Sequence, residues 1–282
     1  MVERSGYSAD LVGAARSVLI EVAHILGEYR KNSVLVGGWV PCLLLPDSPE
    51  PHVGSLDVDL ALDIGQIGAA RYNSLLKTLE NAGYSPSGKA DFQYVRQVRA
   101  ASGRIIRVPL DLLAGEYGGR GKRHQTQRIQ NLKARKARGA DLVFKNADII
   151  TLTGELPDGR KDKVALRVAS PVAFLSMKGM ALAGRTDKPK DAHDIAFLIR
   201  NWPGGIPKLA PLMKGLLKNR LVQEGLGKIR AKFRSPDDFG PVSITAFAQL
   251  QDREARQILA RESYETVTAL LDALGIEPWT GL

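Results

Sequence analysis

The sequence predicts a mixed α/β (α+β) fold with a mixed sheet, followed by a mainly helical C-terminal part. The first observation is a set of short runs in which apolar residues cluster or alternate, as they do in strands, at residues 33–36, 56–62, 92–100 and 104–113. The second is helical periodicity before and between these runs, and the third is a change of pattern after Ser170-Pro171, where helical segments follow one another. We therefore expect two domains, residues 1–168 and residues 169–282.

The composition is that of a globular protein. Of the 282 residues, 44% are hydrophobic and 25% are charged, so the chain can bury a sizeable core. The single cysteine, Cys42, excludes an internal disulfide framework and a cysteine-based zinc cluster, which favours a reducing, cytoplasmic location. The longest uncharged stretch near the start, residues 32–46, is too short to span a bilayer, so we expect no membrane partner.

The charge balance indicates an anionic partner. Forty Lys and Arg against thirty Asp and Glu give a net charge of +10, which attracts polyanions, nucleic acid first among them. Solubility alone is the other interpretation of the excess.

The first third of the chain alternates between helical and strand patterns. The first 30 residues have helical periodicity, and the run 33–36 ends at the turn Gly37-Gly38. Residues 56–62 alternate with period 2, with leucine and valine on one face, and residues 67–82 return to a helical pattern that Gly83 closes.

Two hairpins and four helices are expected after that. Ser102-Gly103 separates the strands at 92–100 and 104–113, and Asp158-Gly159 separates those at 149–156 and 163–168. The helices are expected at residues 172–184, 191–202, 209–233 and 253–274.

Three carboxylates on two predicted strands form a candidate metal site. Asp57 and Asp59 share one face of their strand, roughly 7 Å apart. Asp111 interrupts a second apolar strand, and if the two strands are neighbours, the three acids converge. Hard oxygen ligands suit Mg²⁺ or Mn²⁺, and two such ions support phosphoryl or nucleotidyl transfer. The alternative is that the acids simply face solvent.

The turn at Gly37 and Gly38 is a candidate phosphate site. It follows a strand and opens a predicted helix, so its backbone N–H groups can approach a phosphate closely. Ser55 either contacts phosphate or metal, or only begins a strand.

These motifs together resemble a known signature. The run Val34-Leu35-Val36-Gly37-Gly38, followed by Asp57-Val58-Asp59 and the later Asp111, is similar to the pattern of the DNA polymerase β nucleotidyltransferase superfamily. The resemblance implies a polymerase β-like core in which Asp57, Asp59 and Asp111 bind metal while Gly37 and Gly38 bind the triphosphate of an NTP. The interval between Gly38 and Asp57 is long for this pattern, and a proline-rich loop accounts for it.

A second motif lies near residue 180. Lys178 stands in a mainly apolar helical stretch, from which its ammonium group can reach phosphate oxygens, and Asp191 and Asp194 share one helix face. Helix capping is the alternative role for the two acids. With Lys190, these residues resemble the C-terminal motif of the AbiEii/AbiGii-like toxin nucleotidyltransferase family. The resemblance implies that Lys178 contacts the nucleotide phosphates, and that Asp191 or Asp194 orients Lys178 or positions or deprotonates the acceptor.

An acid-free basic stretch separates Glu116 from Asp141. It predicts RNA binding, with an acidic protein partner or a solvated surface helix as alternatives. Its cations are Arg120, Lys122, Arg123, Arg128, Lys133, Arg135, Lys136 and Arg138. The four histidines show no metal-ligand spacing, and we expect His193 to face solvent, with a contact to the site beside Asp194 as the alternative.

We therefore expect a Mg²⁺-dependent nucleotidyltransferase that moves a nucleoside monophosphate from an NTP to an acceptor, with an RNA such as tRNA favoured. The family resemblance adds a role as a type IV toxin with a neutralising antitoxin protein. Two alternatives stay open. One is a nucleotidyltransferase of the same superfamily that modifies a small molecule or a protein, and the other is a catalytically silent nucleic-acid-binding protein on this fold.

Overall fold

A computed structural model describes residues 3–100, 102–115, 126–129, 132–185 and 187–281. The chain forms two compact units, which we call the sheet unit and the helical unit. The sheet unit comprises Tyr7–Val40 and Gly54–Ser170, and the helical unit comprises Met1–Gly6, Pro41–Val53 and Pro171–Leu282. The prediction of a mixed α/β fold with a mixed sheet and a helical C-terminal part is confirmed.

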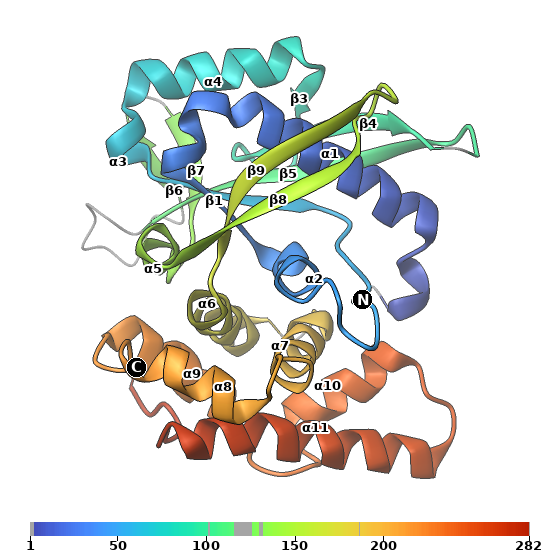
Figure 1. Ribbon diagram of the computed structural model, residues 1–282, viewed down its shortest axis with the longest axis vertical. Coiled ribbons are helices and arrows are strands. Elements are labelled where there is room, and N and C mark those ends of the chain that lie inside the picture. The colour runs from blue at the N-terminus through green and yellow to red at the C-terminus, as the bar shows by residue number, and fades with distance from the viewer. Residues whose placement is uncertain (1–2, 101, 116–125, 130–131, 186, 282) are drawn as a thin grey trace. The chain divides into compact units, whose positions relative to one another are not determined.

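Nine strands in the described part of the sheet unit form one mixed sheet (Figure 1). Its main order is β3-β4-β5-β2-β1-β9-β8, and β7 pairs with both β5 and β6. The strands are β1 (Ser33–Val36), β2 (Val58–Leu62), β3 (Tyr84–Pro86), β4 (Gln93–Arg99), β5 (Ile105–Ala114), β6 (Thr126–Ile129), β7 (Leu132–Lys136), β8 (Ala147–Glu155) and β9 (Lys161–Ala169).

The centre of the sheet brings distant sequence segments together. Strand β2 runs antiparallel to β1 and parallel to β5. The registers align Val36 with Asp59, and Asp59 with Asp111. Side chains of aligned residues on neighbouring strands point to the same face, so the two aspartates share one face of the sheet.

Two helices pack against the other face of the sheet (Figure 1). Helix α1 (Ala9–Leu26) begins where the Ser8 side chain accepts a hydrogen bond from the backbone N–H of Leu11, as an N-cap does. Helix α4 (Ala69–Asn81) ends before Gly83, whose positive φ of 87° suits glycine. Buried leucines of both helices and of β1, β2 and β5 form the core of this unit.

Both predicted hairpins are present, as β4–β5 and β8–β9. Gly159 takes a φ of 85° at the turn of the second one. One boundary differs from the expectation: β2 begins at Val58, so Asp57 lies in a bend just before the strand. Strand alternation therefore does not set the direction of the Asp57 side chain.

The second half of the basic stretch is not helical. Where the structure describes it, the chain forms β6 and β7, and Ala140–Lys145 forms the short helix α5. The helical interpretation of that half is therefore wrong. Pairing of β7 with the end of β5 stabilises the extended conformation there, through backbone hydrogen bonds that periodicity cannot reveal.

The helical unit contains most of the predicted C-terminal helices. They are α6 (Pro171–Gly184), α7 (Lys190–Arg200), α8 (Ile206–Lys214), α9 (Arg220–Arg230), α10 (Phe239–Ala248) and α11 (Arg253–Ala273). The single helix expected at 209–233 is in fact two, because α8 stops at Gly215 and the Asn219 side chain caps α9. Helix α10, which Asp238 caps, was not expected.

Helices α6 and α9 cross closely through two glycines. A Cβ atom added to Gly179 would lie 1.9 Å from the backbone oxygen of Gly225, and one added to Gly225 would lie 2.4 Å from that of Ser176. Only glycine allows this approach, which places α6, the helix that carries Lys178. None of the helices in the described residues is both long enough and apolar enough to cross a membrane.

Candidate active site

Asp59 and Asp111 lie side by side at the centre of the sheet. Their Cα atoms are register partners on the parallel strands β2 and β5, and both residues are half-buried. Like charges on adjacent strands repel, and this repulsion grows as water is removed from around them. The pair is therefore a place where a cation or a set of hydrogen-bond donors would stabilise the fold.

Gly37 lies directly against Asp59. A Cβ atom at position 37 would come 1.9 Å from Asp59 Oδ2, and the residue has a φ of +74°. Glycine is thus required at this position both by the backbone conformation and by the carboxylate. Gly38 follows it in the 3-10 helix Gly37–Trp39, in which Gly38 and Trp39 are buried and which leads into α2 (Val40–Leu44).

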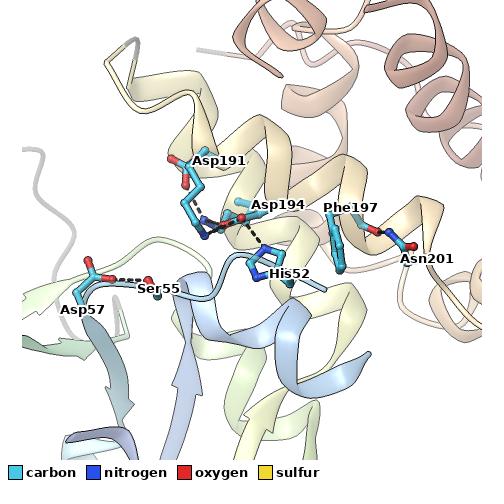
Figure 2. Close-up of polar contacts among 9 residues, drawn as sticks. His52, Ser55, Asp57, Asp191, Asp194, Phe197 and Asn201 are labelled. Carbon is cyan, nitrogen blue, oxygen red and sulfur yellow. Dashed lines mark hydrogen bonds and ion pairs between the residues drawn. The ribbon is translucent and has the colours of Figure 1, made fainter. Parts of the chain in front are cut away.

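Asp57 is held by contacts of its own. Its Oδ1 atom accepts a hydrogen bond of 2.6 Å from Ser55 Oγ (Figure 2), and its backbone oxygen accepts one of 2.9 Å from Trp39 Nε1. Ser55 and Trp39 are both buried. Ser55 therefore orients the acid, a role that the sequence pattern did not suggest.

Asp111 also has a partner that the sequence analysis did not name. Gln93 Nε2 donates a hydrogen bond of 2.7 Å to Asp111 Oδ1, and the two residues are register partners across the β4–β5 hairpin. The turn at Ser102-Gly103 could have revealed this pair, because a hairpin turn fixes the register of the whole hairpin.

The second group of predicted residues lies in the helical unit. Lys178 on α6 reaches two carboxylates of α7, with its Nζ atom 2.6 Å from Asp191 Oδ1 and 2.8 Å from Asp194 Oδ2. Lys190 Nζ also donates to both oxygens of Asp194, at 2.8 and 3.0 Å. The Asp194 side chain is fully buried and that of Lys178 is 11% exposed. We call this group the Lys–Asp cluster.

Electrostatic interactions keep Lys178 and Asp194 of the Lys–Asp cluster charged. Burial alone would lower the pKa of Lys178, but the carboxylates of Asp191 and Asp194 raise it above its usual value. Burial alone would raise the pKa of Asp194, but Lys178 and Lys190 hold it well below its usual range. Lys178 and Asp194 therefore form a buried ion pair near neutral pH.

Two histidines extend the cluster. His52 Nε2 and Asp194 Oδ1 are 3.0 Å apart, and neither side chain is exposed (Figure 2). Because Asp194 is ionised, His52 Nε2 carries the proton and donates it. Burial lowers the pKa of both histidines, that of His193 to about 3, so both rings are neutral near pH 7. The expectation that His193 faces solvent is wrong, since its Nε2 atom is buried and has no hydrogen-bond partner within the described residues.

His52, His193 and Asp194 have the donor atoms of a transition-metal site. One ligand atom from each lies within 4.8 Å of the others, and this is the one such group of three among the described residues. Two imidazoles and a carboxylate suit Zn²⁺ better than Mg²⁺. The ammonium groups of Lys178 and Lys190, both within 3 Å of Asp194, oppose a second cation there.

Sequence spacing could not have found this group, because His52 and Asp194 are 142 positions apart. The carboxylate oxygens of the three predicted acids, Asp57, Asp59 and Asp111, do not all lie within 4.8 Å of one another.

The basic stretch is only partly described. The described residues do not include Arg120, Lys122 and Arg123. Strand β6 contains Arg128, and strand β7 contains Lys133. Arg135 on β7 is the register partner of Leu113 and places its guanidinium 5.6 Å from the centre of the Phe92 ring. Lys136 ends β7, and Arg138 is exposed beyond it.

No protein family model matches the chain, and neither does any of the curated proteins it was compared with. Among solved structures it is similar to an antigenic nucleotidyltransferase-like protein from Paracoccidioides brasiliensis. The two share 22% sequence identity over 85% of this chain and 94% of that chain, with a TM-score of 0.44.

Proposed function

We propose that this chain is a metal-dependent nucleotidyltransferase that moves a nucleoside monophosphate from an NTP to an acceptor hydroxyl. The observation that supports it most is the register that aligns Asp59 with Asp111 while Gly37 lies against Asp59. A strand, a glycine turn and paired acids on the next strands are what the resemblance to the DNA polymerase β superfamily implies. In this proposal residues 1–168 are the catalytic core and residues 169–282 a helical domain.

The donor set of the sheet unit fits Mg²⁺. Asp57, Asp59 and Asp111 offer only carboxylate oxygens, which are the hard ligands that Mg²⁺ prefers. A bound Mg²⁺ would supply a positive charge to the reacting phosphate and to the attacking oxygen. Ser55 and Gln93 then serve to orient Asp57 and Asp111 through their hydrogen bonds.

The reaction forms one bond and breaks one. The acceptor oxygen bonds to the α-phosphorus of the NTP, the bond from that phosphorus to the bridging oxygen of the β-phosphate breaks, and pyrophosphate leaves. The hydroxyl proton passes to a nearby base or to water. Gly37 and Gly38 carry no side chain that would keep phosphate oxygens away from the backbone N–H groups of the turn.

The Lys–Asp cluster has a supporting role in this proposal. Lys178 neutralises triphosphate charge, and Asp191 or Asp194 orients it. The short distances from Lys178 Nζ to both carboxylates are consistent with an orienting function. They also give Lys178 two anionic partners within the helical unit, so its contact with a nucleotide stays a prediction.

RNA is the acceptor that we favour. The net charge of +10 suits a polyanion, and Arg135 lies beside Leu113, two residues along β5 from Asp111. A role as a type IV toxin with an antitoxin partner, and a cytoplasmic location, follow from the family resemblance and are part of the same proposal.

The test is incubation of the purified protein with each of the four NTPs labelled at the α-phosphate, with Mg²⁺ and with tRNA or total RNA. We expect label to enter RNA from at least one NTP, with release of pyrophosphate, and to stop when the metal is chelated.

Label transferred equally well without RNA, to a small molecule or to the protein, would overturn the RNA acceptor and keep the enzyme class. Absence of transfer together with absence of metal-dependent NTP binding would overturn the enzyme class itself.

A further inference from the structure

The β4–β5 hairpin carries an arginine surface on the same sheet face as Asp59 and Asp111. Residues 92–110 contain four arginines and no acidic residue. Arg96 points to the opposite face, where it forms an ion pair of 2.9 Å with Glu21 of α1. The other three are Arg99, Arg104 and Arg107, and all are exposed.

The hairpin register fixes where these side chains point. Gln97 is aligned with Arg107, and Arg99 with Ile105. Because side chains alternate along a strand, Arg107 and Asp111 are on the same face of β5, four residues or roughly 13 Å apart. Arg99 and Arg107 are diagonal neighbours on that face, with roughly 7–8 Å between them, so each can contact a different phosphate.

This part of the hairpin extends beyond the neighbouring strand. Pairing of β2 with β5 begins at Leu110, so the residues of β5 before it have no β2 partner (Figure 1). The tip is nevertheless held in place, because Ser102 Oγ donates a hydrogen bond of 2.6 Å to Asp10 of α1.

The three arginines also lack carboxylate partners. Within the described residues none of them forms an ion pair, and Arg99 donates only to the backbone oxygen of Gly103, at 3.2 Å. Three exposed cations without an acidic neighbour on their own hairpin favour an anionic partner over internal stabilisation.

We propose that the exposed face of the β4–β5 hairpin, with Arg99 and Arg107, binds the sugar-phosphate backbone of the RNA acceptor upstream of its reacting end. This rests on the proposed function for the position of the reacting end beside Asp59 and Asp111. Two exposed arginines on the face that carries Asp59 and Asp111, with no acidic residue on their own hairpin, favour the phosphates of a nucleic acid strand, to which arginine donates charge-assisted hydrogen bonds.

The binding test needs no catalysis. Fluorescence anisotropy would measure the affinity of a labelled single-stranded 20-nucleotide RNA over 50–300 mM salt for the unchanged protein and for the double variant Arg99→Ala/Arg107→Ala. We expect the variant to bind roughly ten-fold more weakly at about 0.1 M salt, and its log–log salt slope to fall by about 1.4, or about 0.7 for each phosphate contact. The matched control is Lys77→Ala/Lys161→Ala, which removes two exposed cations from α4 and β9 of the same unit.

Equal losses in the control and in the hairpin variant would overturn the proposal, since net charge alone would then explain binding. An equal loss of affinity for a poly-glutamate peptide would also overturn it, in favour of an acidic protein partner. This test measures binding and not transfer. If the protein transfers no nucleotide but the hairpin variant shows the expected loss of RNA affinity, the hairpin surface stands and only the enzymatic role is rejected.

A second measurement tests the direction in which the RNA strand lies along the hairpin. A photo-crosslinking nucleotide placed several nucleotides from the 3′ end should crosslink to the hairpin, and one at the 3′ end should not. The reverse pattern would overturn the upstream placement.

Discussion

At the scale of single residues, the position of Asp59 makes it the most informative acid to change. It lies beside Asp111 and against Gly37, so its carboxylate is central to any metal bound by this face of the sheet. We expect Asp59→Asn to lower nucleotide transfer at least about 100-fold, because it removes a charge that stabilises the transition state.

Steady-state transfer with a fixed NTP would measure this effect. Asp148→Asn is the matched control, because Asp148 is an exposed acid on β8 of the same sheet. Near-normal transfer by Asp59→Asn would reject the proposed site.

The contact between Gly37 and Asp59 gives a prediction about stability. We expect Gly37→Ala to lower the free energy of unfolding by about 2 kcal/mol or more, because the new Cβ meets both a positive φ and a carboxylate oxygen. Gly88→Ala is the control, since Gly88 has a φ of 73° and nothing within 4 Å of its added Cβ. Urea unfolding of the two variants separates the cost of the contact from the cost of φ, and equal losses would contradict the role assigned to Asp59.

The predicted site residues differ in how far sequence could define them. Gly37, Asp59 and Asp111 follow from a local pattern, because a glycine turn and period-2 strands leave clear marks in sequence. The hydrogen bond between His52 and Asp194 leaves none, because a single buried pair 142 positions apart has no periodicity. Asp57 is an intermediate case. The sequence pattern identified the residue as a candidate, but the bend before β2 sets the direction of its side chain.

At the scale of elements, the Lys–Asp cluster links two helices. Lys178 of α6 is the buried cation between two acids of α7. We expect Lys178→Met to lower the free energy of unfolding by about 3 kcal/mol, because it removes an ammonium group that two buried carboxylates share. The double variant Lys178→Met/Asp191→Asn should recover much of this loss in urea unfolding, since it removes one of those charges as well.

The same double variant separates structure from catalysis. If Lys178 contacts the triphosphate, the double variant regains stability but keeps a raised KM for NTP and a lowered kcat. If kinetics recover together with stability, the Lys–Asp cluster is a structural link between α6 and α7 alone.

The presence of the helices was predicted better than their boundaries. The strands in the basic stretch were not predicted. The expected helix at 209–233 failed because Gly215 and the cap at Asn219 divide a continuous apolar pattern. Strand β7 was missed because its conformation depends on pairing with residues 113–114 of β5, which charge patterning does not record.

At the scale of the whole molecule, the residues that we propose carry chemistry are divided between the two units. The acids and the glycine turn lie in the sheet unit, and the Lys–Asp cluster lies in the helical unit. Segment Pro41–Val53 joins the helical unit although it falls between β1 and β2 in sequence, and His52 is its contact with α7. Composition could not show this, because contacts between residues far apart in the sequence decide it.

The two buried histidines make the stability of the chain depend on pH. In the unfolded chain a histidine binds a proton near pH 6.5, whereas burial lowers the pKa of His52 and lowers that of His193 to about 3. Burial is the largest cause for both histidines. The negative charge of Asp194 raises both pKa values and the positive charge of Lys190 lowers both, and Arg4 also lowers the pKa of His193. As the pH falls below 6.5 the unfolded state takes up protons that the folded state refuses, so stability is present above pH 6.5 and is lost below it.

We expect the free energy of unfolding to fall between pH 6.5 and pH 4 by up to about 1.4 kcal/mol per pH unit for each histidine. Urea unfolding at half-unit steps of pH would measure it. His193→Phe should reduce the slope by the contribution of one proton, because phenylalanine fills the apolar site beside Phe247 without titrating. Phe247→Leu is the control, since it weakens the same packing and should lower the curve at every pH without changing its slope. A slope that His193→Phe leaves unchanged would mean that His193 is already protonated in the folded chain, and that water reaches the ring that the structure buries.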